Sequence, residues 1–322
     1  MLYPLTFEPI FQERVWGGRR LESLYAKPLA PGKLIGESWE IADRPGTASV
    51  IANGPLAGHD LRWLMENHAD ELLGDFPHNG RFPWLAKLLD ARADLSVQVH
   101  PPAATAEQLG GEPKTEAWFV SHAEADARLI AGLRPGVSRE KFEARLGSVD
   151  FPLCLNELPV TAGDALFLPS GRLHALGAGT VVFEIQQNSD TTYRVYDWNR
   201  PGLDGQPREL HLAKALQCID FDEVKPRLQR RDYQPANGHA TRLIALAPEA
   251  FRLEHIRMET DAAIVLPGEG VRLVAVTDGR LTLDGAGETL PLGPGQFALV
   301  PATAETTAAR GVDAQFLLTQ AA

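Results

Sequence analysis

The segment Gly163-Asp-Ala-Leu-Phe-Leu-Pro169 decides the fold, because the same arrangement returns later in the chain as Gly295-Gln-Phe-Ala-Leu-Val-Pro301. In each segment a glycine suited to a turn precedes an apolar stretch, and a proline ends that stretch. The pattern predicts a short β-strand between two turns. Its recurrence suggests a duplicated jelly-roll unit, although a repeat this short also arises by chance.

The surroundings of both segments are also rich in predicted strands. Residues 160–187 are dense in β-branched and apolar residues broken by glycine, which favours short antiparallel strands. The 29 glycines and 24 prolines of the chain favour turns over long helices. Further short strands are expected at 271–276, 280–283, 287–292 and 296–300.

We therefore expect a mainly β protein of two domains. Residues 1–225 are predicted to form a jelly-roll barrel with helical insertions, and this part contains the candidate metal and catalytic residues given below. Residues 226–322 are predicted to form a smaller jelly roll, and it is expected to be metal-free because no histidine follows His255. The polar, proline-containing segment 222–238 is the expected connection.

A few helices are expected between the strands. Asp60 is a plausible N-cap for a helix through Leu72, and Ser138 for a helix through Leu146. Short helices are also expected at 104–109 and 209–219. The apolar stretch Phe82–Asp90 fits either a buried strand or a short helix, since periodicity alone does not separate the two.

Composition excludes several classes of protein. The formal net charge is -11 and the pI is about 5.3, so a nucleic-acid-binding surface is not expected. Neither a signal peptide nor a run of about 18 apolar residues is visible, so no membrane association is expected. Cys154 and Cys218 are far apart, and we interpret them as reduced thiols of a cytoplasmic protein. Such an acidic protein can still bind a phosphorylated metabolite in a local basic pocket.

Four side chains are candidates for a metal site. Gln98 and His100 point the same way from one predicted strand, because side chains alternate with a period of two. Glu116 lies on a second predicted strand, and His174 follows the turn at Pro169-Ser-Gly171. Two imidazoles, a carboxylate and an amide oxygen would suit a catalytic zinc with an open coordination position. A Gln-x-His pair is also common without a metal, so a structural interpretation stays open.

Two resemblances bear on this choice. The spacing from Gly163 through Pro169 and Gly171 to His174 resembles the second half of the cupin motif, whose histidine is a metal ligand. The chain departs from that motif at Ala178, where asparagine is usual, and in the long separation of Glu116 from His100. Six blocks in family order then resemble type I phosphomannose isomerases of the shorter bacterial branch. These blocks are Pro9–Gly18, Gly36–Glu40, Gln98–Pro101, Lys114–Trp118, Pro169–Ala175 and Glu184–Asp197.

The second resemblance implies a function and a site. It implies one Zn²⁺ per chain, and it places Arg194 and Lys114 at the active site. It implies that Lys87 lies near the pocket; Arg200 is a further candidate for the substrate phosphate, and Trp16 for the pocket wall. The metal ligands it implies are Gln98, His100, Glu116 and His174. Asn188 stands where the family often has proline, which removes no ligand.

The implied reaction converts mannose 6-phosphate to fructose 6-phosphate by moving a proton between C1 and C2. A metal and a cation such as Arg194 would stabilise the developing negative oxygen. The general base stays open among Lys114, Glu184 and Glu40. The alternatives are a metal cupin acting on another sugar or as an iron oxygenase, and a sugar-phosphate sensor without catalysis. The expected partner is a small sugar phosphate, and the expected assembly is a monomer or small homo-oligomer.

Overall fold

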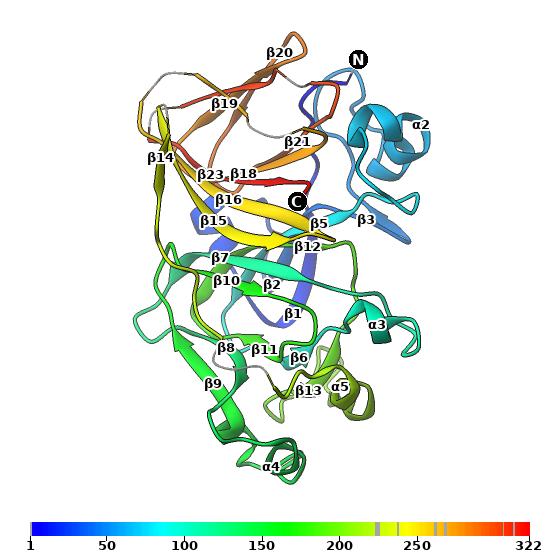
Figure 1. The fold of residues 1–322 in the computed structure, drawn as a ribbon, viewed down its shortest axis with the longest axis vertical. Helices are drawn as coiled ribbons and strands as arrows, with labels where there is room; N and C mark the ends of the chain where they lie inside the picture. The colour runs from blue at the N-terminus through cyan, green and yellow to red at the C-terminus, as the bar shows by residue number, and fades with distance from the viewer. Residues whose placement is uncertain are drawn as a thin grey trace.

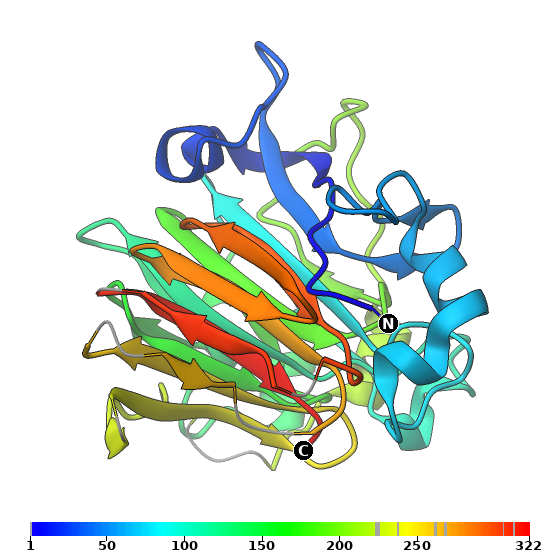
Figure 2. The same cartoon turned by 90° about the horizontal axis from the view of Figure 1, so that it is seen from above.

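Four antiparallel sheets form successive layers of the protein. The computed structural model describes residues 2–222, 226–236, 238–260, 263–266, 269–304, 306–311 and 313–322. Over these residues the chain is mainly β, as predicted, and Figures 1 and 2 show the layers from two directions. A separate two-stranded ribbon joins β3 (Asp43–Arg44) and β4 (Thr47–Ala48).

The first sheet lies in the middle of the stack, and its strands β5 and β12 are buried on both faces. This explains why Phe82–Asp90 shows no alternation of apolar and polar residues: most of it is the strand β5, and the ambiguity is resolved in favour of a strand. In sheet order its strands are β1 (Ile10–Gly18), β2 (Ile35–Ile41), β5 (Trp84–Ala91), β12 (Thr180–Gln187), β7 (Glu116–Ala123) and β10 (Ala165–Leu168).

The second sheet covers one face of the first. Trp118, Val120 and Val182 of the first sheet pack against Leu129 and Leu176 of the second. Because alternate residues of a strand face opposite ways, Glu116 and Glu184 share this face with those apolar side chains. The strands of the second sheet are β13 (Tyr193–Tyr196), β6 (Val97–Val99), β11 (His174–Leu176), β8 (Arg128–Leu133) and β9 (Leu155–Pro159).

The third and fourth sheets lie on the other side of the first sheet and close around a second core. The third sheet contains β14 (Gln234–Ala236), β15 (His239–Ala247), β16 (Phe251–Met258), β23 (Gln315–Gln320), β18 (Arg272–Asp278) and β21 (Phe297–Val300). The fourth contains β17 (Ile264–Val265), β22 (Ala308–Arg310), β19 (Leu281–Gly285) and β20 (Glu288–Leu292).

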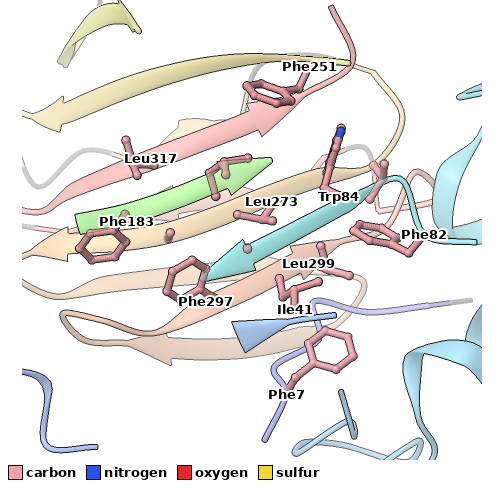
Figure 3. Close-up of a cluster of buried hydrophobic side chains, with 14 of the residues drawn as sticks. Phe7, Ile41, Phe82, Trp84, Phe183, Phe251, Leu273, Phe297, Leu299 and Leu317 are labelled. Carbon is pink, nitrogen blue, oxygen red and sulfur yellow. The ribbon is translucent and has the colours of Figure 1, made fainter. Parts of the chain in front are cut away.

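The largest core cluster joins the first and third sheets across the predicted boundary between residues 225 and 226. Figure 3 shows Phe183 of β12 beside Phe297 of β21, and their ring centroids are 5.6 Å apart. The indole Nε1 of Trp84 donates a hydrogen bond to the carbonyl of Ala250 at 2.9 Å. Each such buried aromatic contributes about 1.5–3 kcal/mol of hydrophobic stabilisation. The two halves of the chain therefore share one interior.

The repeated segments occupy equivalent places in their sheets. Gly163 N–H donates to the carbonyl of Val120, and Gly295 N–H donates to that of Val276. Both glycines have a positive φ, +88° and +76°, which glycine adopts without strain. Each then leads into an edge strand, β10 or β21, that ends immediately before the proline.

The helices are few and short. Their first residues agree with the residues predicted from the sequence better than their last residues do. Asp60 caps α2 (Leu61–Leu73) by accepting from Trp63 N–H at 2.7 Å, and Ser138 caps α4 (Arg139–Glu143). The helix expected at 209–219 is only α5 (Leu212–Cys218), because His211 N–H is held by the carbonyl of Arg194. The others are α1 (Arg20–Tyr25), α3 (Ala103–Ala106) and a 3₁₀ turn, Phe151–Cys154. Among the described residues no helix combines the length and the apolar character that crossing a membrane requires.

Candidate metal centre and the adjoining cavity

Three buried side chains converge between the first and second sheets. His100 follows β6, Glu116 opens β7 and His174 opens β11. His100 Nε2 lies 3.3 Å from one carboxylate oxygen of Glu116, and His174 Nε2 lies 3.3 Å from the other. Their potential ligand atoms all lie within 4.8 Å of one another, so they could hold one metal ion.

The Nδ1 hydrogen bonds of the two imidazoles fix their tautomers, so that each Nε2 presents a lone pair to the cluster. His100 Nδ1 lies 2.8 Å from the carbonyl of Thr191, and His174 Nδ1 lies 2.8 Å from that of Arg172. A carbonyl only accepts, so each Nδ1 carries the proton and each Nε2 presents a lone pair to the cluster. Fixing a histidine by a backbone carbonyl is the usual support of a metal ligand.

Three polar atoms at the centre of the cluster lack a hydrogen-bond partner among the described residues. His100 Nε2 and both carboxylate oxygens of Glu116 are buried without a hydrogen-bond partner. Orphaned buried polar atoms are costly unless an ion or water satisfies them. Nitrogen and oxygen donors of this kind fit Zn²⁺, and the residues present therefore fit the group expected from the sequence.

The protonation states also suit metal binding. Burial, assisted by nearby Lys114, lowers the pKa of His100 to about 3, and burial likewise lowers the pKa of His174. Burial alone would raise the pKa of Glu116, but Lys114, His100 and His174 together outweigh burial and hold that pKa well below its ordinary value. Neutral imidazoles and an ionised carboxylate are the ligand forms at neutral pH.

Gln98 lies on β6, opposite His174 of β11, and its side chain adjoins the cluster. Its Nε2 lies 3.4 Å from His174 Nε2, and its Oε1 lies 3.4 Å from Ser96 Oγ. The two ends of a carboxamide are assigned from their hydrogen bonds, and a half turn of the amide exchanges them. That rotation would turn the amide oxygen toward the cluster as a fourth donor.

A cavity of about 650 Å³ adjoins this cluster. Gln98 and Lys114 belong to its wall, and Lys114 Nζ lies 3.1 Å from Glu116 Oε2, which connects the cavity to the buried cluster. Its other polar lining residues are Glu13, Arg14, Glu37, Lys87, Ser96, Glu184, Asp190, Thr192, Arg194, Asp204 and Arg208.

One wall of the cavity carries a buried ion-pair network. Lys87 Nζ lies 3.2 Å from Glu184 Oε1 and 3.7 Å from Glu37 Oε2, while Trp118 Nε1 donates to Glu184 at 2.8 Å. Burial alone would lower the pKa of Lys87, but its two carboxylate partners raise it. Burial and the charge of Glu116 raise the pKa of Glu184. Lys87 therefore stays protonated, and its positive charge is already balanced by carboxylates of the protein.

The predicted site residues are distributed unevenly around the cavity. Arg194, Lys114, Lys87 and Trp16 line it, whereas Arg200 is not among the described lining residues and instead pairs with Asp197 at 2.9 Å.

Glu40, one of the three candidate bases, lies elsewhere. It pairs with Lys27 at 2.6 Å and is not among the described residues that line the cavity.

Sequence reasoning missed Glu37, Arg14 and Arg208 as lining residues. A signal existed for Glu37, because it shares one face of β2 with Trp39 and lies in the Gly36–Glu40 block that resembles the family. Trp39 Nε1 donates to Glu37 Oε2 at 2.7 Å, and Arg14 Nε donates to the other oxygen at 2.7 Å. Arg208 lies in a loop without periodicity, and no local pattern marks it.

Glu37 is expected to make folding stability depend on pH below about 4.5. Burial opposes its ionisation, but Lys87 and Arg14 lower its pKa from the ordinary 4.5 to about 2. A carboxylate whose folded pKa is lowered stabilises above its unfolded pKa, and that stability is lost as pH falls through the folded pKa. The shift corresponds to about 3 kcal/mol. In urea unfolding, the stability gap between wild type and Glu37→Gln should narrow as pH falls from about 5 toward 2. A gap independent of pH would contradict this assignment.

Comparisons with known proteins agree with the geometry. Residues 5–115 match the profile of the family described as phosphomannose isomerase type I, catalytic domain. The chain is 43% identical over 226 residues to the probable mannose-6-phosphate isomerase GmuF of Bacillus subtilis, covering 70% of each protein. It is 39% identical over 249 residues to the mannose-6-phosphate isomerase of Streptococcus mutans, covering 77% of each. The crystal structure of the Bacillus subtilis mannose 6-phosphate isomerase superposes with a TM-score of 0.90 at 31% identity, over 99% of this chain and 100% of that one.

Proposed function

The chain belongs to the type I phosphomannose isomerase family, and we propose that its cavity interconverts mannose 6-phosphate and fructose 6-phosphate. The relatives described above support mannose 6-phosphate as the substrate through their names. The observation that carries the proposal is the orphaned His100–Glu116–His174 cluster, which opens through Lys114 onto a cavity lined by acids and bases.

The reaction needs a base, a proton donor and stabilisation of negative charge. A base removes the C2 proton of the open-chain aldose while O1 gains a proton, which gives an enediol. The O2 hydroxyl then loses its proton as C1 gains one, and the ketose results. Each half-step moves one proton off carbon and one onto oxygen, or the reverse, so no oxidant or reductant is required.

We propose Gln98, His100, Glu116 and His174 as the ligands of one Zn²⁺ ion. When bound, the ion supplies Lewis-acid stabilisation of negative charge on a substrate oxygen. The pairing of Lys114 with Glu116 places an ammonium beside the same centre. Arg194 on β13 lines the cavity, and its Nε is buried without a hydrogen-bond partner. We propose that the Arg194 guanidinium stabilises the negative charge that develops on a substrate oxygen.

Glu184 is the proposed general base. It lines the cavity and is buried, and its raised pKa brings its proton affinity closer to that needed at neutral pH. Lys87 and Trp118 hold both of its oxygens in place. Lys87 and Trp16 complete the wall of the substrate site, and Arg200 contributes through its pairing with Asp197.

The remaining sequence-based expectations form part of the same proposal. We propose that residues 226–322 are a metal-free jelly roll that supports the catalytic part, residues 1–225. The equivalent turns at Gly163 and Gly295 favour this duplication. A cytoplasmic location and a monomer or small homo-oligomer are proposed as well, and the two buried free thiols fit a reducing compartment.

Purified protein should convert mannose 6-phosphate to fructose 6-phosphate. We expect chelation to abolish the activity and added Zn²⁺ to restore it, measured by a coupled fructose 6-phosphate assay. Oxygen uptake measured in parallel would reveal an oxygenase, and calorimetry would reveal a sensor that binds without turnover. Zinc-loaded protein that leaves mannose 6-phosphate unchanged would overturn the proposed substrate.

A further inference from the structure

A loop that joins β13 to α5 forms part of the cavity wall. Gly202, Leu203, Asp204 and Arg208 of this loop, residues 197–211, line the cavity. The loop is tied at its neck, where Pro201 and Pro207 form a β-bridge and Gly202 N–H donates to the carbonyl of Gln206 at 2.6 Å. The loop therefore presents its side chains to the cavity from a defined backbone.

The same loop is fastened to Arg194 on β13. Arg194 Nη1 donates to the carbonyl of Glu209 at 2.8 Å, and the backbone N–H of Arg194 donates to His211 Nδ1 at 3.1 Å. These bonds leave the Nε–H of Arg194 buried without a partner. Arg194 and the loop are thus built as one unit.

A single buried carboxylate orients two further guanidinium groups. Arg208 donates to Asp197 Oδ2 through Nε at 2.6 Å and to Oδ1 through Nη2 at 2.5 Å. Arg200 donates to Oδ1 of the same group at 3.2 and 2.9 Å. Arg208 lines the cavity, whereas Arg200 is not among the described lining residues. Asp197 therefore orients Arg208 at the cavity wall, and Arg200 holds Asp197 without lining the cavity itself.

Two guanidinium groups share one buried carboxylate in this part of the site. Arg200 and Arg208 both pair with Asp197, and Arg194 is fastened to the same loop through the Glu209 carbonyl. The loop carries two further carboxylates: Asp204, which lines the cavity and accepts from Gln206 N–H, and Glu209, whose side chain is 83% exposed. Asp190 also lines the cavity, on the strand side of the loop.

The ratio of cations to carboxylates is reversed at Lys87 on the opposite wall. Lys87 is balanced there by Glu37 and Glu184 at 3.7 and 3.2 Å. A phosphate dianion would have to displace a carboxylate to bind Lys87, whereas on the arginine side Asp197 divides its charge between Arg200 and Arg208. Arginine also matches phosphate oxygens with two parallel donors, which a lysine cannot do.

We propose that Arg208 binds the phosphate group of the substrate, and that Asp197 is the positioning residue that orients Arg208. This assignment rests on the proposed function and extends it, because it places the phosphate against the loop rather than against Lys87. The loop thereby becomes the element that selects phosphorylated over unphosphorylated sugars.

The test compares Arg208→Gln with wild type in steady-state kinetics and in inhibition by inorganic phosphate. Hydrogen bonds to charged groups account for the expected size of the change. KM for mannose 6-phosphate and the inhibition constant of inorganic phosphate should each rise about 10- to 150-fold, while kcat changes much less. Arg310→Gln, which removes an exposed arginine paired with Asp284 on the fourth sheet, is the matched control and should match wild type.

Further variants separate binding from folding. Asp197→Asn should raise the same two constants, to a smaller extent, because Arg208 keeps its charge and loses its orientation. Arg208→Lys should raise both constants to an intermediate extent. This variant tests the role of Arg208 if Arg208→Gln fails to fold. Wild-type turnover combined with constants within twofold of wild type in the Arg208 variants would overturn this inference alone. Absence of turnover in wild type would instead overturn the proposed function.

Discussion

Replacing His174 with alanine is expected to remove the bound metal and nearly all isomerase activity. The imidazole Nε2 lies 3.3 Å from Glu116 Oε1, and the Nδ1 atom is held by the carbonyl of Arg172. Losing an outer-shell partner of a metal ligand typically costs about 10- to 100-fold in affinity or activity. Losing the ligand itself should cost more, so we expect activity to fall by over about 100-fold.

Metal content measured by elemental analysis should fall from one Zn²⁺ per chain to substoichiometric levels in His174→Ala. His78→Ala is the control, because His78 is exposed and its Nδ1 only accepts from Gly80 N–H. A melting curve should show that the variant is folded. Full zinc occupancy and full activity in folded His174→Ala would refute the proposed ligand set.

Replacing Glu184 with glutamine is expected to reduce kcat by about 10²- to 10⁴-fold, the range for loss of a general base. Glutamine preserves the shape of the side chain and removes its ability to accept a proton. KM should change less, because the substrate phosphate is assigned to the opposite wall. Zinc content should stay at the wild-type level, since Glu184 is not among the proposed ligands.

Glu40→Gln is the matched control for this prediction. Glu40 is also a buried glutamate paired with a lysine, Lys27 at 2.6 Å, but the cavity lining does not include it. Both variants lose one buried ion pair, so any difference in kcat reports the position of the carboxylate. Exchange of the C2 proton of the substrate with solvent deuterium should slow in Glu184→Gln. Wild-type kcat and exchange in that variant would assign the base elsewhere.

Local sequence patterns predicted much of the architecture. The glycine-to-proline segments predicted β10 and β21, and the caps at Asp60 and Ser138 predicted the starts of α2 and α4. These features depend on interactions within a few residues, which a sequence displays directly. Helix ends were less accurate: α5 starts late because Arg194 holds His211 in the preceding loop.

The candidate ligands were also visible in the sequence. Period-two alternation places Gln98 and His100 on one face, and the turn before His174 brings that residue into register with Gln98 on the neighbouring strand. Family resemblance supplied the order of the blocks and the expectation of zinc. The tautomers of His100 and His174 required coordinates, because they depend on carbonyls of distant residues.

What the sequence determined by itself is therefore the strand content, the main turns and the residue types of the candidate metal centre. The tertiary structure alone decided which charges meet across the cavity: Lys87 with Glu37 and Glu184, and Arg208 with Asp197. It also decided that β5 lies between two layers. Local periodicity reports how a residue faces its own strand or helix, whereas ion pairs and two-sided burial depend on chain segments brought together only by the packing of the sheets.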